Sequence, residues 1–200
     1  MPPVRGKVIA RIILERVRNH LLDHQHPEQS GFTPKKSTID CILALCVLTK
    51  RRQELWQGLL AAYVDLHKVF DSVNRDVLWR TLGLCGVPPK LINLMSDLCS
   101  GSESADRCGA AIPDLFPVVT GVHQGCVMAP TLFSTYKDWI LGRMSERSSC
   151  GASFGNFKIS DLDFTDNAVI FAETLDILLG ALEVLNEDSE PLGLHTQRAS

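Results

Sequence analysis

The sequence predicts an α+β fold, in which helices are interspersed with a few short strands. Three observations support this prediction. Apolar residues recur at helical spacing in several segments, short apolar runs of strand length lie between them, and one stretch is typical of a β-hairpin. Of the 200 residues, 45% are hydrophobic and 22% are charged. A chain of this size and composition is expected to form one large domain or two small ones, with a sizeable core.

The first quarter of the chain predicts two helices joined by a loop. Residues 4–23 place apolar side chains such as Ile13 and Val17 at helical spacing, which indicates an amphipathic helix. The segment HPEQSGFTPKKST is rich in Pro, Gly, Ser and Thr, and is therefore expected to be a loop. A second helix is predicted from Ser37 or Thr38 to about residue 52. Three basic residues near its C-terminal end suit the helix dipole.

A buried strand and two further helices follow. Residues 59–66, LLAAYVDL, form a short apolar run that predicts a buried strand, with Asp65 near its C-terminal end. Asn74 is expected to cap a helix that runs to about Cys85 and stops at the Gly-Val-Pro-Pro turn. The two prolines of that turn then begin another helix, PKLINLMSDLCS.

The second half of the chain alternates between strands and helices. Residues 105–120 are ambiguous, with strands as one interpretation, and a helix is predicted from Pro130 to about Met144. Residues 158–173, KISDLDFTDNAVIFAE, predict two short strands around a tight turn at Asp166-Asn167. The segment TLDILLGALEVLNE is expected to form a closing helix.

Charge is distributed unevenly along the chain. The formal net charge of −3 by itself argues against a nucleic-acid partner. However, residues 1–52 hold ten Lys and Arg against four Asp and Glu, whereas the remainder holds ten against nineteen. A basic end joined to an acidic body suggests polyanion contact in one region and metal chemistry in another. Solvated charges on two helix faces explain the same split equally well.

The termini and the cysteines indicate an intracellular protein, either cytoplasmic or nuclear and not secreted. Charged residues interrupt the N-terminal segment, so it is not a signal peptide, and no apolar run reaches the roughly 18 residues of a membrane span. The seven cysteines form no Cys-x-x-Cys pair and predict reduced core thiols, with disulfides as the alternative. His20, His24 and His26 are interpreted as surface residues in preference to zinc ligands.

Two aspartates at strand ends form a candidate metal site. Asp65 ends one apolar strand, and Asp166 lies in the predicted hairpin turn. Carboxylates that converge from separate strands suit a hard cation such as Mg²⁺, which prefers oxygen ligands and leaves positions open for phosphates. Ordinary turn chemistry is the alternative, because Asp and Asn both tolerate the backbone angles of a tight turn.

Motifs that follow one another in a known order resemble the reverse transcriptases of non-LTR, LINE-type retrotransposons. AYVDLHKVFDSVNRDVLW is similar to their first catalytic motif, GVHQGCVMAPTLFSTYKDWI to the next, and DLDFTDNAVIFAE to the third. QSGFTPKKSTIDCI resembles their fingers motif, and LGLHTQ the start of a fourth palm motif. The resemblance covers about residues 7–197, and several motifs in order are far more specific than any one alone.

The resemblance implies a right-hand polymerase fold with an antiparallel palm sheet packed by helices. Residues 1–58 would form a fingers-like segment and residues 59–200 a palm-like segment, without a thumb. The implied activity is template-directed DNA synthesis on RNA, with an RNA template, a DNA primer and deoxynucleoside triphosphates as partners. Oligomeric state is not indicated.

The same resemblance assigns site residues. Asp65 and Asp166 would bridge two Mg²⁺ ions that activate the primer 3′-hydroxyl, and the backbone carbonyl of Leu66 would contact a metal ion. The expected nucleotide-binding residues are Lys35 and Lys36 at the triphosphate, Phe70 under the sugar, and Gln124 and Gly125 at the incoming nucleotide and template.

Several positions depart from the family pattern. Asn167 stands where the third carboxylate is expected, which removes one negative charge from a site for two divalent cations. Thr33 and Lys36 replace arginines of the fingers motif, and His123 replaces another arginine. We therefore expect an impaired or inactive enzyme (a pseudoenzyme). The alternatives are a non-catalytic nucleic-acid-binding domain and a non-functional retrotransposon remnant, with an active polymerase also left open.

Overall fold

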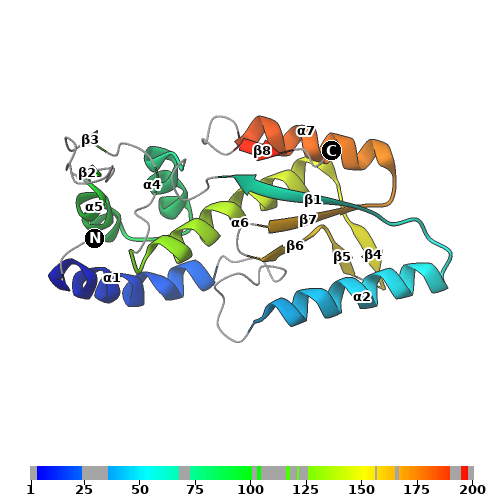
Figure 1. Cartoon of the computed structure of the whole chain (residues 1–200), viewed down its shortest axis with the longest axis horizontal. Helices are drawn as coiled ribbons and strands as arrows, with labels where there is room; N and C mark the ends of the chain where they lie inside the picture. The colour runs from blue at the N-terminus through cyan, green and yellow to red at the C-terminus, as the bar shows by residue number, and fades with distance from the viewer. Residues whose placement is uncertain are drawn as a thin grey trace, which may run out of the picture. The chain divides into compact units, whose positions relative to one another are not determined.

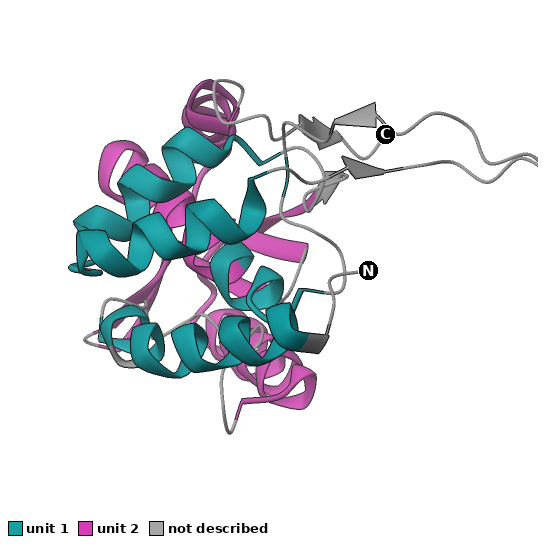
Figure 2. Ribbon diagram, turned by 90° about the vertical axis from the view of Figure 1, so that its left-hand side faces the viewer, with its two compact units in different colours: residues 1–24, 70–133 teal, residues 25–69, 134–200 magenta. Residues whose placement is uncertain are grey.

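The computed structural model contains helices and antiparallel strands (Figure 1), which confirms the predicted mixture of α and β structure. The chain divides into two compact units, each assembled from two separate stretches (Figure 2). Unit 1 comprises residues 1–24 and 70–133, and unit 2 comprises residues 25–69 and 134–200. The residues that the structure describes are 4–23, 36–67, 73–100, 103–104, 116–117, 121, 126–155, 157–164, 167–189 and 195–197.

Unit 1 consists mainly of helices. Helix α5 packs against both α1 and α4, and strands β2 and β3 pair as a short antiparallel ribbon. The predicted cap of α4 is confirmed, because the Asn74 side chain accepts hydrogen bonds from the backbone N–H groups of Asp76 and Val77. The elements are α1 (Val4–Leu22), α4 (Arg75–Leu84), α5 (Pro89–Cys99), β2 (Glu103–Ser104) and β3 (Phe116–Pro117). Most of residues 105–120 lie outside the described residues.

Unit 2 is built on an antiparallel sheet with strand order β6-β7-β1-β8. The central pair, β1 and β7, aligns Leu60 with Ala172 at one end and Asp65 with Asn167 at the other. A second, two-stranded sheet is formed by β4 and β5. The strands are β1 (Leu60–His67), β4 (Ala152–Phe154), β5 (Phe157–Ile159), β6 (Asp161–Phe164), β7 (Asn167–Ala172) and β8 (His195–Gln197).

Helices cover both faces of the larger sheet (Figure 1). Helix α7 (Leu175–Ser189) packs against β1 and β7 on one face, together with Ile140 and Leu141 of helix α6 (Ala129–Ser148). Helix α2 (Thr38–Glu54) packs on the other face, where Leu48 joins the buried Phe171 and Ala152. This arrangement buries apolar side chains on both faces of the sheet, with Val64 on one face and Phe171 on the other.

The C-terminal hairpin differs in detail from its prediction. Residues 158–173 contain the end of β5 as well as β6 and β7, so two strands were too few. The predicted turn at Asp166-Asn167 is wrong for Asn167, because β7 already begins at this residue; Asp166 lies outside the described residues. Asn167 pairs with Phe164 of β6 and with Asp65 of β1, and this pairing on both sides keeps it in the sheet. Helix α6 likewise continues four residues beyond the predicted end at Met144.

Two further expectations concern cysteines and membranes. In the part of the chain that the structure describes, no disulfide joins the cysteines, which are Cys41, Cys46, Cys85, Cys99, Cys126 and Cys150. Cys85, Cys99 and Cys150 are buried as expected of core thiols, but the expectation is wrong for Cys46, which is exposed. Within the same residues, no helix combines the length and the apolar character needed to cross a membrane.

Candidate functional site

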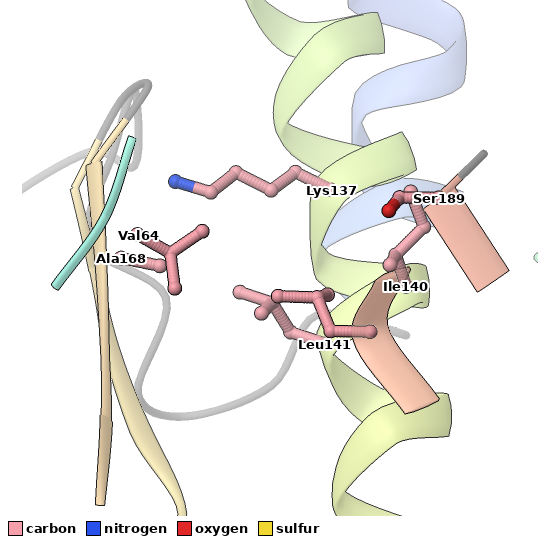
Figure 3. A pocket seen from close by; sticks show the side chains of 7 residues that line it. Val64, Lys137, Ile140, Leu141, Ala168 and Ser189 are labelled. Atoms are coloured by element: carbon pink, nitrogen blue, oxygen red, sulfur yellow. The ribbon is translucent and has the colours of Figure 1, made fainter. Parts of the chain in front are cut away.

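Asp65 lies on the exposed side of strand β1. Side chains alternate along a strand, and here Tyr63 and Asp65 are exposed while the intervening Val64 is buried. Val64 faces α6 and α7, where it lines a small cavity (Figure 3), so Asp65 projects from the opposite face of the sheet. The carboxylate therefore avoids the cost of burying a charge and is accessible to a ligand.

Strand pairing brings Asn167 directly opposite Asp65. Asn167 is the first residue of β7, it is exposed, and its Cα partner in β1 is Asp65. Directly opposite residues of an antiparallel pair have Cβ atoms about 4.5–5.5 Å apart and project from the same face. A carboxylate and an amide thus lie together at one end of the β1–β7 pair.

The donor atoms of this pair fit a hard cation, although they form only part of a site. Carboxylate and amide oxygens are the ligand types that Mg²⁺ prefers. Among the residues that can be described, no group of three His, Cys, Asp or Glu side chains is arranged to hold a metal ion. Asp166, which is adjacent to Asn167 in sequence, lies outside the described residues.

The other predicted site residues are distributed as follows. The backbone of Leu66 belongs to β1, where it pairs with Thr196 of β8. Lys36 is exposed and lies two residues before α2, outside the strand pairing that joins Asp65 to Asn167. The remaining predicted residues lie outside the described part of the chain: Lys35, Phe70, Gln124, Gly125 and Asp166.

The motif GVHQGC begins at a residue whose backbone is fixed on both sides. The N–H of Gly121 donates to the carbonyl of Val73 at 2.9 Å, and the carbonyl of Gly121 accepts from Arg75 Nε at 2.8 Å. Arg75 also donates to the carbonyl of Cys99 at 2.9 Å. In unit 1, the start of this motif is therefore anchored to helices α4 and α5.

Sequence reasoning missed two charged residues beneath the sheet, Lys137 of α6 and Asp163 of β6. They form a fully buried ion pair, and Lys137 Nζ also donates to the backbone carbonyl of Asn167 at 2.8 Å. A signal was available in the sequence. Lys137 interrupts the apolar face of a helix, four residues after Phe133, and Asp163 lies on the inward face of its strand. Charged residues at core positions require buried partners.

Comparison with protein families identifies the class. A model described as "Reverse transcriptase (RNA-dependent DNA polymerase)" matches residues 1–199. The chain therefore belongs to the reverse transcriptase family.

Curated relatives point to retrotransposons, as the motifs predicted. The chain is 25% identical over 182 residues to the retrovirus-related Pol polyprotein of the type-2 retrotransposable element R2DM of Drosophila melanogaster. It is 27% identical over 185 residues to the corresponding polyprotein of the type-1 element R2 of Nasonia vitripennis. These matches cover 90% and 92% of the chain but only 17% and 18% of the relatives. The chain thus spans less than a fifth of their length.

Solved structures show the same fold. Telomerase from Candida tropicalis, in complex with a fragment of telomeric RNA, matches 92% of the chain with a TM-score of 0.67. Telomerase from Candida albicans, also in complex with a telomeric RNA fragment, matches 96% with a TM-score of 0.62. The chain covers 32% and 33% of these proteins, at 13% and 12% sequence identity. Likeness at this level of identity establishes the fold alone.

Proposed function

We propose that this chain is the fingers and palm part of a retrotransposon reverse transcriptase, built for template-directed DNA synthesis on an RNA template. The observation that carries the proposal is the pairing of Asp65 with Asn167 at one end of the β1–β7 pair. The first and third catalytic motifs are about a hundred residues apart in sequence, and this register makes them neighbours. Membership of the reverse transcriptase family supports the same activity.

The proposed chemistry depends on divalent metal ions. Asp65 and Asp166 would hold two Mg²⁺ ions, with the backbone carbonyl of Leu66 as a further ligand. Bound Mg²⁺ would supply activation of the primer 3′-hydroxyl and stabilisation of charge on the triphosphate. The protein's own part is to present oxygen donors from separate strands at the exposed end of the β1–β7 pair. Deoxynucleoside triphosphates and a DNA primer are the proposed co-substrates.

The nucleotide-binding roles also remain part of the proposal. Lys35 and Lys36 would act as point charges toward the triphosphate. Phe70 would lie under the sugar, and Gln124 and Gly125 would contact the incoming nucleotide and the template. The division into a fingers segment, 1–58, and a palm segment, 59–200, belongs to the same proposal.

We further propose that the site is impaired in this chain. The Asn167 side chain supplies a neutral amide at the position where the family pattern has a carboxylate. An amide oxygen can contact a metal ion, but it does not offset the repulsion between two divalent cations as a carboxylate does. Weak metal binding is the expected consequence.

Primer extension on an RNA template tests this proposal. With Mg²⁺ or Mn²⁺, we expect little or no extension by the parent chain, an increase in the Asn167→Asp variant, and none after Asp65→Ala is added to it. Incorporation that survives Asp65→Ala would refute the metal assignment. If Asn167→Asp restores nothing, the missing carboxylate is not the sole defect of the chain.

A second candidate function is nucleic-acid binding without catalysis, which the neutral Asn167 side chain favours. Exposed Lys36, together with exposed Lys50 and Arg51 near the end of α2, would contact phosphates. Binding to an RNA–DNA hybrid should then weaken steeply as salt increases, and Lys36→Ala should reduce the salt slope. Binding that does not respond to salt would exclude this function. If the chain shows neither primer extension nor binding to nucleic acid, the result supports the third hypothesis, a non-functional retrotransposon remnant.

A further inference from the structure

Lys137 and Asp163 form a buried ion pair between helix α6 and strand β6, both within unit 2. The exposed fraction of the Lys137 side chain is 0% and that of Asp163 is 1%. Charged residues are almost never fully buried unless they are paired. Breaking such a pair by removing one partner leaves an uncompensated charge in the core, which is strongly unfavourable.

The same ammonium group also contacts the backbone of the proposed site. Lys137 Nζ donates to the carbonyl oxygen of Asn167 at 2.8 Å. Asn167 is the residue that pairs with Asp65, and Asp163 pairs with Ala168, the next residue of β7. One side chain of α6 thus holds β6 through a carboxylate and the first residue of β7 through a carbonyl.

The surroundings of Lys137 show why its position is well defined. Its side chain extends from α6 toward the strands (Figure 3), past a small cavity lined mainly by apolar residues that include Val64, Ile140 and Ala168. The carboxylate of Asp163 and the carbonyl of Asn167 both hold its ammonium group in place.

We propose that Lys137 is a positioning residue, which fixes Asn167 opposite Asp65 through the buried contacts below the sheet. The proposal rests on the proposed function, because it assigns a role to this pair of residues as a cation site. Lys137 does not touch the bound ion; it acts through the backbone of Asn167. The position of β7 relative to α6 would then control the separation of the two oxygen donors.

The test replaces the ion pair by apolar residues of similar size. Lys137→Met combined with Asp163→Leu removes both charges together, so neither member of this pair is left facing a neutral partner, and the melting temperature should stay near that of the parent. Lys137→Met alone should lower the melting temperature further than the paired change. Lys158→Met is the matched control, because Lys158 Nζ also donates to one backbone carbonyl, that of Ser149 at 2.7 Å, but at the surface.

Two measurements then separate positioning from folding. In the paired variant, backbone amides at the start of β7 should exchange faster with deuterium than in the parent, while the rest of the sheet is unchanged. The dissociation constant for Mn²⁺, measured by electron paramagnetic resonance, should rise about 10-fold or more, as for loss of other groups that orient metal ligands. Lys158→Met should change neither quantity. If the ion pair served only to stabilise the fold, the paired variant would match the parent in amide exchange and in Mn²⁺ affinity, as it does in melting temperature.

The outcomes distinguish this inference from the proposed function. Parent-like exchange and Mn²⁺ affinity in the folded paired variant would overturn the inference. If the parent binds no Mn²⁺, or if Asp65→Asn leaves Mn²⁺ binding unchanged, the proposed metal site is refuted. Amide exchange at the start of β7 in the paired variant then decides by itself whether Lys137 positions Asn167. Should the paired variant not fold, exchange in the parent decides. In the parent, amides at the start of β7 should then exchange as slowly as those of Phe171 and Ala172. Much faster exchange at the start of β7 than at these two residues would reject the inference.

Discussion

Glu173 illustrates how a single residue can join several elements of unit 2. Its carboxylate accepts a hydrogen bond from the backbone N–H of Ser153 at 3.1 Å and one from Arg52 Nη1 at 2.9 Å. Arg52 is buried and donates in addition to the carbonyl of Gly58 at 3.1 Å through Nε. Hydrogen bonds from Ser153, with a smaller contribution from Arg52, hold the pKa of Glu173 below its ordinary value of 4.5.

This lowered pKa predicts how stability depends on pH. A carboxyl group whose pKa is lower in the folded state stabilises the fold above its unfolded pKa, and this contribution is lost as pH falls through the folded pKa. Glu173→Gln should therefore be less stable than the parent at pH 7, and the difference should shrink below about pH 4.5. Urea unfolding at several pH values measures this. Glu54→Gln is the control at an exposed ion pair, and a difference that persists at low pH would contradict the prediction.

Thiol reactivity is a second prediction at the scale of single residues. Burial raises the pKa of the Cys150 thiol, and burial likewise raises that of Cys99, although Arg75 opposes the shift. Because the thiolate is the reactive form, both should resist alkylation in the folded protein, whereas the exposed Cys46 should react. Mass spectrometry after brief maleimide treatment locates the adducts. If Cys150 reacts as fast as Cys46, the Cys150 thiol is not buried, and the prediction is wrong.

At the scale of elements, the start of helix α4 depends on one side chain. Asn74 Oδ1 accepts from the backbone N–H of Asp76 at 3.0 Å and of Val77 at 3.4 Å. Without these bonds, the first turn of the helix loses partners for its N–H groups. We expect Asn74→Ala to lower the free energy of unfolding by about 1 kcal/mol, and Asn74→Ser to retain most of it. Equal losses in both variants, measured by urea denaturation, would argue against the capping role.

The elements themselves were largely predictable, and the reason is physical. Helical periodicity, the proline start of α5 and the Asn74 cap depend on residues within a few positions of one another. The register of β7, in contrast, does not depend on residues nearby in sequence. A shift by one residue would reverse which side chains face the core, and this choice is made by pairing with β1, which is about a hundred residues away in sequence. The sequence prediction therefore placed Asn167 in a turn, whereas it lies in strand β7.

The whole molecule is organised by units that are not continuous in sequence. The chain passes between them three times, after residues 24, 69 and 133. Helix α6 runs through the last of these boundaries, with Phe133 in unit 1 and Ser134 in unit 2. Unit 2 holds 11 Lys and Arg against 15 Asp and Glu, so acidic residues prevail in the unit that contains the proposed cation site.

The continuous helix predicts that the two units unfold together. Trp79 lies in unit 1, whereas Trp139 lies in unit 2. One variant keeps only Trp79 and a second keeps only Trp139, with the other two tryptophans replaced by Phe in each. Tryptophan fluorescence then follows the unfolding of each unit separately. We expect coincident urea midpoints, because unfolding either unit would strip packing from part of α6. Separate midpoints would show that the units are independent. The absence of any cooperative transition would favour the remnant hypothesis.

The sequence by itself determined the class of fold, the order of the motifs and most of the helices, because these depend on local periodicity and on residue types at short spacing. It also identified Asp65 as a candidate ligand. Only the tertiary structure decided that Asn167 lies in a strand opposite Asp65, and that Lys137 and Asp163 pair beneath it. Both facts depend on strand register and on burial, which are set by residues distant in sequence. A buried charge reveals its role only when its partner is known.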